Sequence, residues 1–236
     1  VRVKQPSFNA SLPSCSAPRH TVCFLKTHKC ASSSVQNLLM RYGERHQLTF
    51  ALPRRGGYLG HLALLNRTVA VGTPPFDMLV HHTRFQEDEA RALLKSDPVF
   101  VTIVREPAAL FESLYSYYDL EDLRNATENS SLAQQLRIIL PGPKRTHHGL
   151  NQMSYDLGFD LEQAHNESAV RDFVARLDAV FDLVMVAERM NESLVLLRHL
   201  LCWELDDVIV FKLNARQVSG VLFDCGGGIL CLGEPH

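Results

Sequence analysis

The chain has 236 residues, a net charge of −2, 46% hydrophobic residues and 21% charged residues, the ordinary composition of one globular domain or slightly more. This charge gives no general case for nucleic-acid binding. No apolar run reaches the roughly eighteen residues of a transmembrane helix. Residues 1–20 contain several prolines and serines, so we expect a stem or linker there.

Asparagines indicate the cellular compartment. Six of the nine asparagines begin an N-x-[ST] sequon, where chance would give about one. This excess favours the secretory pathway. The six are Asn9, Asn66, Asn125, Asn129, Asn166 and Asn191. Asn191 can alternatively cap the N-terminus of a helix.

Cysteines are too few and too scattered for a disulfide scaffold. Cys23 falls in an apolar run and Cys30 in a polar loop, so neither is an obvious bridge partner. Cys15, Cys202, Cys225 and Cys231 can pair, and the sequence leaves the pairing open. No C-x-x-C or H-E-x-x-H spacing argues for a metal site.

The first predicted unit is a strand at Thr21–Leu25, a basic loop at Lys26–Ser32 and a helix with Ser32 or Ser33 as its N-cap. Backbone N–H groups at a helix N-terminus, together with a lysine, form a cradle for an anion. The loop lacks the glycines of G-x-x-x-x-G-K-[ST], which makes a nucleotide P-loop a poor match. A purely structural loop is an equally good interpretation of these residues alone.

Two further strands are predicted at Leu48–Leu52 and Phe76–Val80. Arg54 and Arg55 follow the first of these and are expected to be solvated. The second leads into His81 and His82. Ligands bind at the carboxyl ends of parallel strands, so a histidine there is a candidate general base, with a packing or surface histidine as the alternative.

Val99–Val104 is the clearest strand, continuously apolar and β-branched. Pro107 suits the first turn of the following helix. Arg105 at the strand end and Ser113 on that helix can bind one phosphate together. The alternative is an arginine paired with Glu106 or Glu112.

The remaining predicted elements are mainly structural. They are an acidic loop at 119–131, a short helix at Leu132–Leu140, a basic stretch at 141–149, a helix at Glu167–Phe181, a strand at Leu183–Ala187 and a helix at Asn191–Trp203. His147 and His148 lie in the basic stretch, which we expect to be a solvated loop.

Several segments resemble one family in its own order. Leu25–Ser34 is similar to the 5′-phosphosulfate loop of Golgi carbohydrate sulfotransferases, and most closely to the galactose-3-O-sulfotransferase family. The Arg105–Ser113 spacing, His82-Thr-Arg-Phe85, Asn151–Phe159 and Glu188–Arg216 match later family segments. The resemblance covers roughly residues 20–216. The glycine-rich tail at 217–236 looks like an alternative or truncated terminus, because family members continue for much longer.

The resemblance implies a P-loop-like, three-layer α/β sulfotransferase fold in a domain at residues 21–216. It also implies the co-substrate 3′-phosphoadenosine 5′-phosphosulfate (PAPS) and chemistry without a metal. Lys29 would stabilise the leaving group, His82 would be the base, and His28 would orient substrate or assist the lysine. The residues expected to bind the donor are Lys26, Thr27, Lys29, Cys30, Ala31, Ser32, Ser33, Ser34, Arg105 and Ser113. Cys30 stands where the family often has threonine, which predicts weaker PAPS binding.

The acceptor implied by the resemblance is the 3-hydroxyl of terminal β-galactose on a glycolipid or glycoprotein. His147 and His148 fall in the region that shapes the acceptor side in the family. The resemblance further implies a type II membrane protein of the Golgi lumen, with its signal-anchor upstream of this chain. One alternative function is an inactive, truncated isoform that binds or regulates a luminal partner. A weaker one is a magnesium-dependent nucleotide phosphotransferase, which the missing Walker pattern disfavours.

Overall fold

The computed structural model describes residues 2–3, 15–117, 151–210, 222–224 and 230–232. The predictions for residues 119–149, including His147 and His148, lie outside these residues, as does most of the tail. Among the described residues, no helix has both the length and the apolar character needed to cross a bilayer.

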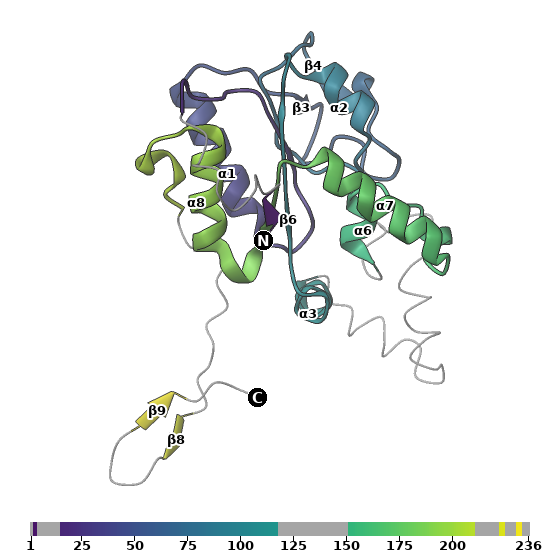
Figure 1. Cartoon of the computed structure of the whole chain (residues 1–236), viewed down its shortest axis with the longest axis vertical. Helices are drawn as coiled ribbons and strands as arrows, with labels where there is room; N and C mark the ends of the chain where they lie inside the picture. Colours follow the sequence, from purple (N-terminus) through teal and green to yellow (C-terminus); the bar gives the residue numbers. More distant parts are fainter. Residues whose placement is uncertain (1, 4–14, 118–150, 211–221, 225–229, 233–236) are drawn as a thin grey trace, which may run out of the picture.

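The centre of the molecule is a five-stranded sheet with the order β1-β7-β6-β2-β5 (Figure 1). Its strands are β1 (Arg2–Val3), β2 (Val22–Leu25), β5 (Met78–Leu79), β6 (Val99–Val104) and β7 (Leu183–Val186). The last four are parallel to their neighbours, and β1 pairs antiparallel with β7 at the edge. The mainly parallel sheet is the architecture that the sequence predicts.

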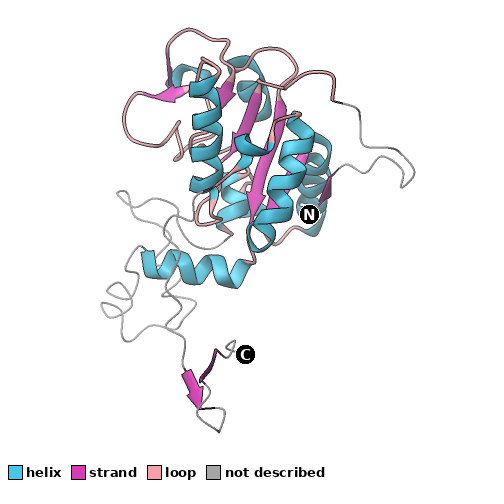
Figure 2. Cartoon of the chain, turned by 90° about the vertical axis from the view of Figure 1, so that its left-hand side faces the viewer, coloured by secondary structure: helices cyan, strands magenta, loops and turns pink. Residues whose placement is uncertain are grey.

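Helices cover both faces of this sheet. α1 (Ser32–Arg45) and α8 (Met190–Leu201) lie on one face, and α2 (Glu87–Leu93) and α7 (Glu167–Val180) lie on the other (Figures 1 and 2). α6 (Gln152–Asp156) lies near α7, and α3 (Pro107–Tyr117) follows β6 at the end of the sheet. The three predicted layers are therefore confirmed.

Smaller elements complete the described chain. β3 (Leu52–Pro53) pairs with β4 (Ala70–Val71), and β8 (Leu222–Asp224) pairs with β9 (Leu230–Leu232). Short 3₁₀ turns occupy Arg67–Val69, Leu161–Gln163, Ala187–Arg189 and Leu205–Val208.

The parallel strands are buried on both faces, which explains their continuous apolar sequence. Successive side chains of a strand point to opposite faces, and the two cores divide accordingly. Val22 and Phe24 pack with α1 and α8, whereas Cys23 and Leu25 pack on the α2 and α7 side. All four are fully buried, so β2 is fixed in position. The loop that follows β2 therefore starts from a rigid point.

Two predicted strands are shorter than expected. Of the segment predicted at Leu48–Leu52, only Leu52 belongs to a strand, as the first residue of β3, and Phe50 makes a single bridge to Met78. The strand predicted at Phe76–Val80 is reduced to β5. The Asp77 carboxylate accepts hydrogen bonds from the Thr49 backbone N–H and hydroxyl at 2.9 and 2.7 Å. These side-chain bonds add to the backbone bonds that Asp77 and Met78 donate to the Thr49 carbonyl.

Helix boundaries confirm some predictions, correct others and add helices that were not predicted. α3 begins at Pro107 as predicted. α8 begins at Met190 with Arg189 as its N-cap, so the interpretation of Asn191 as a cap is wrong. α2 was not predicted, although its first turn carries three acidic residues and the Gln86 side chain accepts from the Glu89 N–H. Acidic groups at this end interact favourably with the positive end of the helix dipole.

One cysteine pair is resolved. Cys15 and Cys202 form a disulfide, which ties the segment before β2 to the end of α8. Cys23 and Cys30 are buried free thiols, as expected. This disulfide agrees with an oxidising compartment.

Candidate active site

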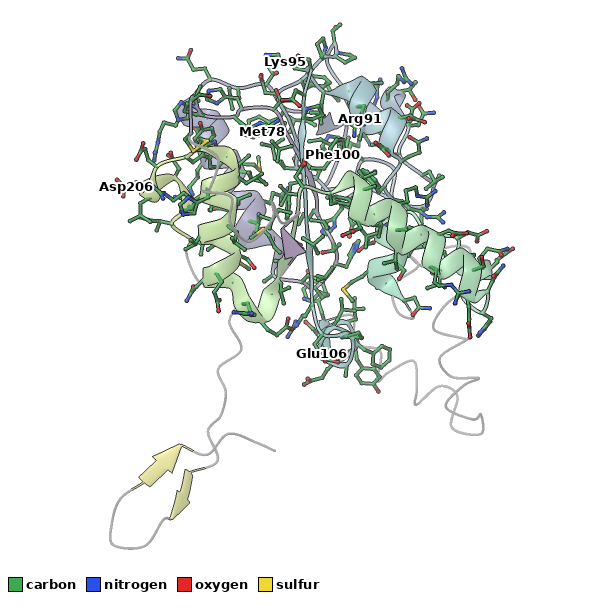
Figure 3. The ribbon with its side chains drawn as sticks, viewed as in Figure 1. Met78, Arg91, Lys95, Phe100, Glu106 and Asp206 are labelled. Atoms are coloured by element: carbon green, nitrogen blue, oxygen red, sulfur yellow. A yellow bond between two sulfur atoms is a disulfide. The ribbon has the colours of Figure 1, made fainter. Side chains whose placement is uncertain are left out.

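Three adjacent strands end at one edge of the sheet and deliver the predicted site residues there. β2 leads into Lys26, β5 into His81 and His82, and β6 into Arg105. Glu106, which follows Arg105, lies at the α3 end of the sheet, whereas Lys95 lies at the opposite end (Figure 3). Parallel topology therefore gathers segments that are far apart in sequence.

A cavity of about 340 Å³ opens at this edge. Nine of the twelve predicted residues line it: His28, Lys29, Ala31, Ser32, Ser33, Ser34, His82, Arg105 and Ser113. Tyr58 and Tyr117, which were not predicted, complete the lining. Lys29 and Arg105 thus open onto one space. We call Lys29, Ser33, Ser34, Arg105 and Ser113 the cationic face of this cavity.

The loop between β2 and α1 has an unusual backbone. Lys29 and Ala31 both have positive φ, 55° and 56°, a conformation that costs a non-glycine residue of order 1–3 kcal/mol. The N-cap of α1 is Ala31, with no side-chain capping bond, so the prediction of Ser32 or Ser33 as cap is wrong. Ser32 begins the helix and donates from Oγ to the Thr27 carbonyl instead.

The strained loop is held by bonds from buried side chains. Thr27 Oγ1 donates to the carbonyl of Ile103 on β6, and Ser32 closes the turn. The amides of the first turn of α1 have no acceptor within the helix, and Ser33 and Ser34 on that turn line the cavity. This arrangement suits an anion at the helix N-terminus.

Three of the predicted donor-binding residues do not line the cavity. The Thr27 hydroxyl is used within the fold, and the Lys26 ammonium donates to Gln36 Oε1 at 2.6 Å. The Cys30 side chain is fully buried in the core beside α1, and burial raises the pKa of its thiol to about 12. These side chains support the loop from beneath, and only their backbone can reach a ligand.

The remaining cationic face is half-exposed. The Lys29 ammonium lies 3.6 Å from the ring centroid of Tyr117, a cation–π contact. Arg105 donates to the Lys29 carbonyl at 3.0 Å and lies 3.8 Å from the Glu188 carboxylate. Glu106 accepts from the first amides of α3, Ala108 and Ala109. The charge of Arg105 also helps to lower the pKa of Glu106, but the ion pair of Arg105 is with Glu188.

Two imidazoles meet at the inner wall. The rings of His28 and His82 stack with centroids 4.1 Å apart. His82, and not its neighbour His81, lines the cavity, and its Nδ1 lies 2.8 Å from the Lys26 carbonyl. Burial, followed by the charges of His28 and Lys26, lowers the pKa of His82 to about 2. His82 is therefore neutral at physiological pH.

Behind His28 lies a buried polar cluster that the sequence did not reveal. His28, His61, Gln152 and Asp156 form it, and we call it the Asp156 cluster. Asp156 Oδ1 accepts from Gln152 Nε2 and His61 Nε2, both at 2.9 Å. Asp156 Oδ2 lies 2.7 Å from the His28 backbone nitrogen and 2.9 Å from its Nδ1. Although burial alone would raise it, these hydrogen bonds and the His28 charge hold the Asp156 pKa well below its usual range.

A signal for this cluster was present but faint. Gln152 and Asp156 are four residues apart on α6, so both face inward. Tyr58 and His61 stand singly in segments without a recognisable pattern, and Tyr117 is one of several tyrosines near the end of α3. Only the fold shows that they belong to the site.

The Asp156 cluster also has the composition of a metal site. Ligand atoms of His28, His61 and Asp156 lie within 4.8 Å of one another. In this structure the same atoms bind each other directly at 2.9 Å. The geometry is that of a hydrogen-bonded carboxylate between two imidazoles.

Comparison with known proteins finds one matching family model and several similar proteins. The family model for galactose-3-O-sulfotransferase matches residues 1–223, which include every residue that lines the cavity. Mouse galactose-3-O-sulfotransferase 3 is 41% identical over 218 residues, covering 87% of this chain and 50% of that protein. Human galactosylceramide sulfotransferase is 37% identical over 224 residues, covering 90% and 52%. The chain therefore spans about half the length of the curated relatives it matches.

Proposed function

Because the chain belongs to the galactose-3-O-sulfotransferase family, we propose that it transfers a sulfuryl group from PAPS to the 3-hydroxyl of a terminal β-galactose. The observation that supports this most strongly is the single cavity lined by both Lys29 and the Arg105–Ser113 pair. A donor with a phosphosulfate at one end and a 3′-phosphate at the other needs cationic groups at two places in one space.

The fit to PAPS follows from the chemistry of the lining. The amides of the first turn of α1, with Ser33 and Ser34, can bind the 5′-phosphate, and Lys29 can contact the phosphosulfate. Arg105 and Ser113 would bind the 3′-phosphate, the group that distinguishes PAPS from adenosine 5′-phosphosulfate. Lys26, Thr27 and Cys30 contribute through the shape of the loop.

The reaction forms a bond between the acceptor oxygen and sulfur, and it breaks the bond between sulfur and the bridging phosphate oxygen. The electron pair of the broken bond leaves on 3′,5′-ADP, and the acceptor hydroxyl loses its proton. Lys29 stabilises the charge that develops on the leaving oxygen. His28 and His82 are the cavity imidazoles available to take the proton.

The acceptor is proposed from the relatives. Galactosylceramide sulfotransferase is named for a glycolipid, and the other matched relatives are named for galactose. We therefore propose galactose-terminated glycolipids or glycoproteins as acceptors. The sequons and the Cys15–Cys202 disulfide support a site of action in the secretory pathway, and we propose the Golgi lumen, with a membrane anchor upstream of this chain.

The decisive experiment supplies PAPS with ³⁵S-labelled sulfate and a β-galactoside to the purified chain. We expect labelled galactoside, and a matched 3-deoxygalactoside should accept no label. Equal labelling of both acceptors would contradict the assignment of the 3-hydroxyl. Binding of 3′,5′-ADP without transfer would instead identify a luminal binding protein, and magnesium-dependent transfer from ATP would identify a phosphotransferase.

A further inference from the structure

The Asp156 cluster is unusual because it buries a full negative charge. Asp156 is completely buried, and such a charge is tolerated only when hydrogen bonds satisfy it. Here the donors come from three separate segments: the loop after β2, the His61 segment and α6 itself. Structural stability alone rarely requires this, because apolar packing of the same volume is often as stable.

The contact with Asp156 fixes the hydrogen positions on His28. An ionised carboxylate can only accept hydrogen bonds. His28 Nδ1 lies 2.9 and 3.0 Å from the two carboxylate oxygens, so Nδ1 carries the hydrogen. In the neutral ring, Nε2 is then a proton acceptor.

This acceptor nitrogen lies on the cavity side of the ring. His28 Nε2 is 3.3 Å from the hydroxyl of Tyr58, and both residues line the cavity. Tyr58 is 40% exposed. Its hydroxyl therefore marks a position from which an entering sugar hydroxyl can donate to the same nitrogen.

His82 has a different environment. Its Nδ1 is bound to a backbone carbonyl, that of Lys26, and not to a carboxylate. A neutral carbonyl stabilises a protonated imidazole less than a carboxylate does. The His82 ring stacks on His28 and restricts its rotation.

From this geometry we propose that Asp156 is a positioning residue that makes His28 Nε2 the general base of the transfer. This inference rests on the proposed function, and it selects His28 over His82 as the group that takes the proton. In the reaction, the proton of the acceptor hydroxyl moves to His28 Nε2 as the oxygen–sulfur bond forms. Asp156 keeps its negative charge and stabilises the imidazolium, as in an Asp-His pair.

The test replaces Asp156 with asparagine, which preserves shape but removes the charge. We expect Asp156→Asn to lower kcat by about 100- to 1,000-fold, with the KM for PAPS changed less than threefold. A matched control is Asp77→Asn. Asp77 is also a buried carboxylate, bound to Lys95 at the opposite end of the sheet, and its loss should lower the melting temperature without lowering kcat.

A second measurement does not depend on turnover. With ¹⁵N-labelled histidine, NMR should show His28 protonated at Nδ1 and unprotonated at Nε2, and Asp156→Asn should shift it toward the other tautomer. If the wild type transfers no sulfate, the proposed function fails. The NMR spectrum then tests, independently of turnover, whether Asp156 sets the tautomer of His28.

Two further variants keep the proposal testable if Asp156→Asn does not fold. His28→Gln should lower kcat more than His82→Gln, with 3′,5′-ADP binding retained in both. The reverse order would overturn the proposal, as would an Asp156→Asn enzyme with kcat within threefold of wild type. Loss of turnover in EDTA that Zn²⁺ restores would also overturn it, because the cluster would then be a metal site.

Discussion

The cationic face and the Asp156 cluster share one cavity, yet they are built in opposite ways. The cationic face is half-exposed, and its residues come from two strand–loop–helix units, each contiguous in sequence. The Asp156 cluster is buried and joins residues from three separate segments, with 128 residues between His28 and Asp156. The cationic face is arranged to bind an anionic ligand that enters from solvent. The Asp156 cluster contains a buried carboxylate that stays charged. Donor binding and proton removal should therefore respond differently to mutation.

The largest effect should come from the cationic face. We expect Lys29→Ala to lower kcat about 1,000-fold, or about 4 kcal/mol, because Arg105, the other Lys or Arg among the described residues that line the cavity, is assigned to the 3′-phosphate. The measurement is the initial rate with labelled PAPS at saturation. Arg54→Ala removes an exposed positive charge from a nearby loop and should leave the rate unchanged. A Lys29→Ala enzyme within tenfold of wild type would assign the charge stabilisation elsewhere.

Substitution of Arg105, on the same cationic face, should have an intermediate effect that separates donor binding from chemistry. Arg105→Lys keeps the charge but loses the planar fork that grips a phosphate. We expect the KM for PAPS to rise about 30-fold and kcat to change less than threefold. Ser113→Ala, which removes one hydroxyl bond, should raise the KM about fivefold.

The control for Arg105 is the donor itself. Wild-type enzyme should prefer PAPS strongly over adenosine 5′-phosphosulfate, which lacks the 3′-phosphate. Arg105→Lys should lose most of this preference. Unchanged discrimination would show that the 3′-phosphate binds elsewhere.

The contrast between the two regions also explains what the sequence could predict. β6 and the start of α3 were predictable because a continuous apolar run and a proline are local signals. The cationic face was predicted from the family resemblance, and its residues meet because parallel topology brings the ends of β2 and β6 together. The Asp156 cluster could not be predicted, because a lone histidine such as His61 has no local pattern and its partner lies 95 residues away.

Differences in the loop have a related cause. The sequence predicted a serine cap on α1, and it placed Cys30 among the donor-binding residues because Cys30 falls inside the motif. In the structure, the residues on either side of Cys30, Lys29 and Ala31, both have positive φ. Cys30 therefore points into the core while its neighbours Lys29 and Ala31 line the cavity.

The smallest effect is expected at this cysteine. Cys30→Thr restores the residue common in the family, and weaker donor binding was predicted from its absence. Because the Cys30 side chain is fully buried and its Sγ contacts the His28 carbonyl at 3.2 Å, a threonine hydroxyl here can bond the same carbonyl. We expect 3′,5′-ADP affinity to change less than twofold by calorimetry, with stability altered by about 1 kcal/mol. A tenfold gain in affinity for 3′,5′-ADP would mean that the side chain of residue 30 faces the donor. Residue 30 would then line the cavity together with its neighbours.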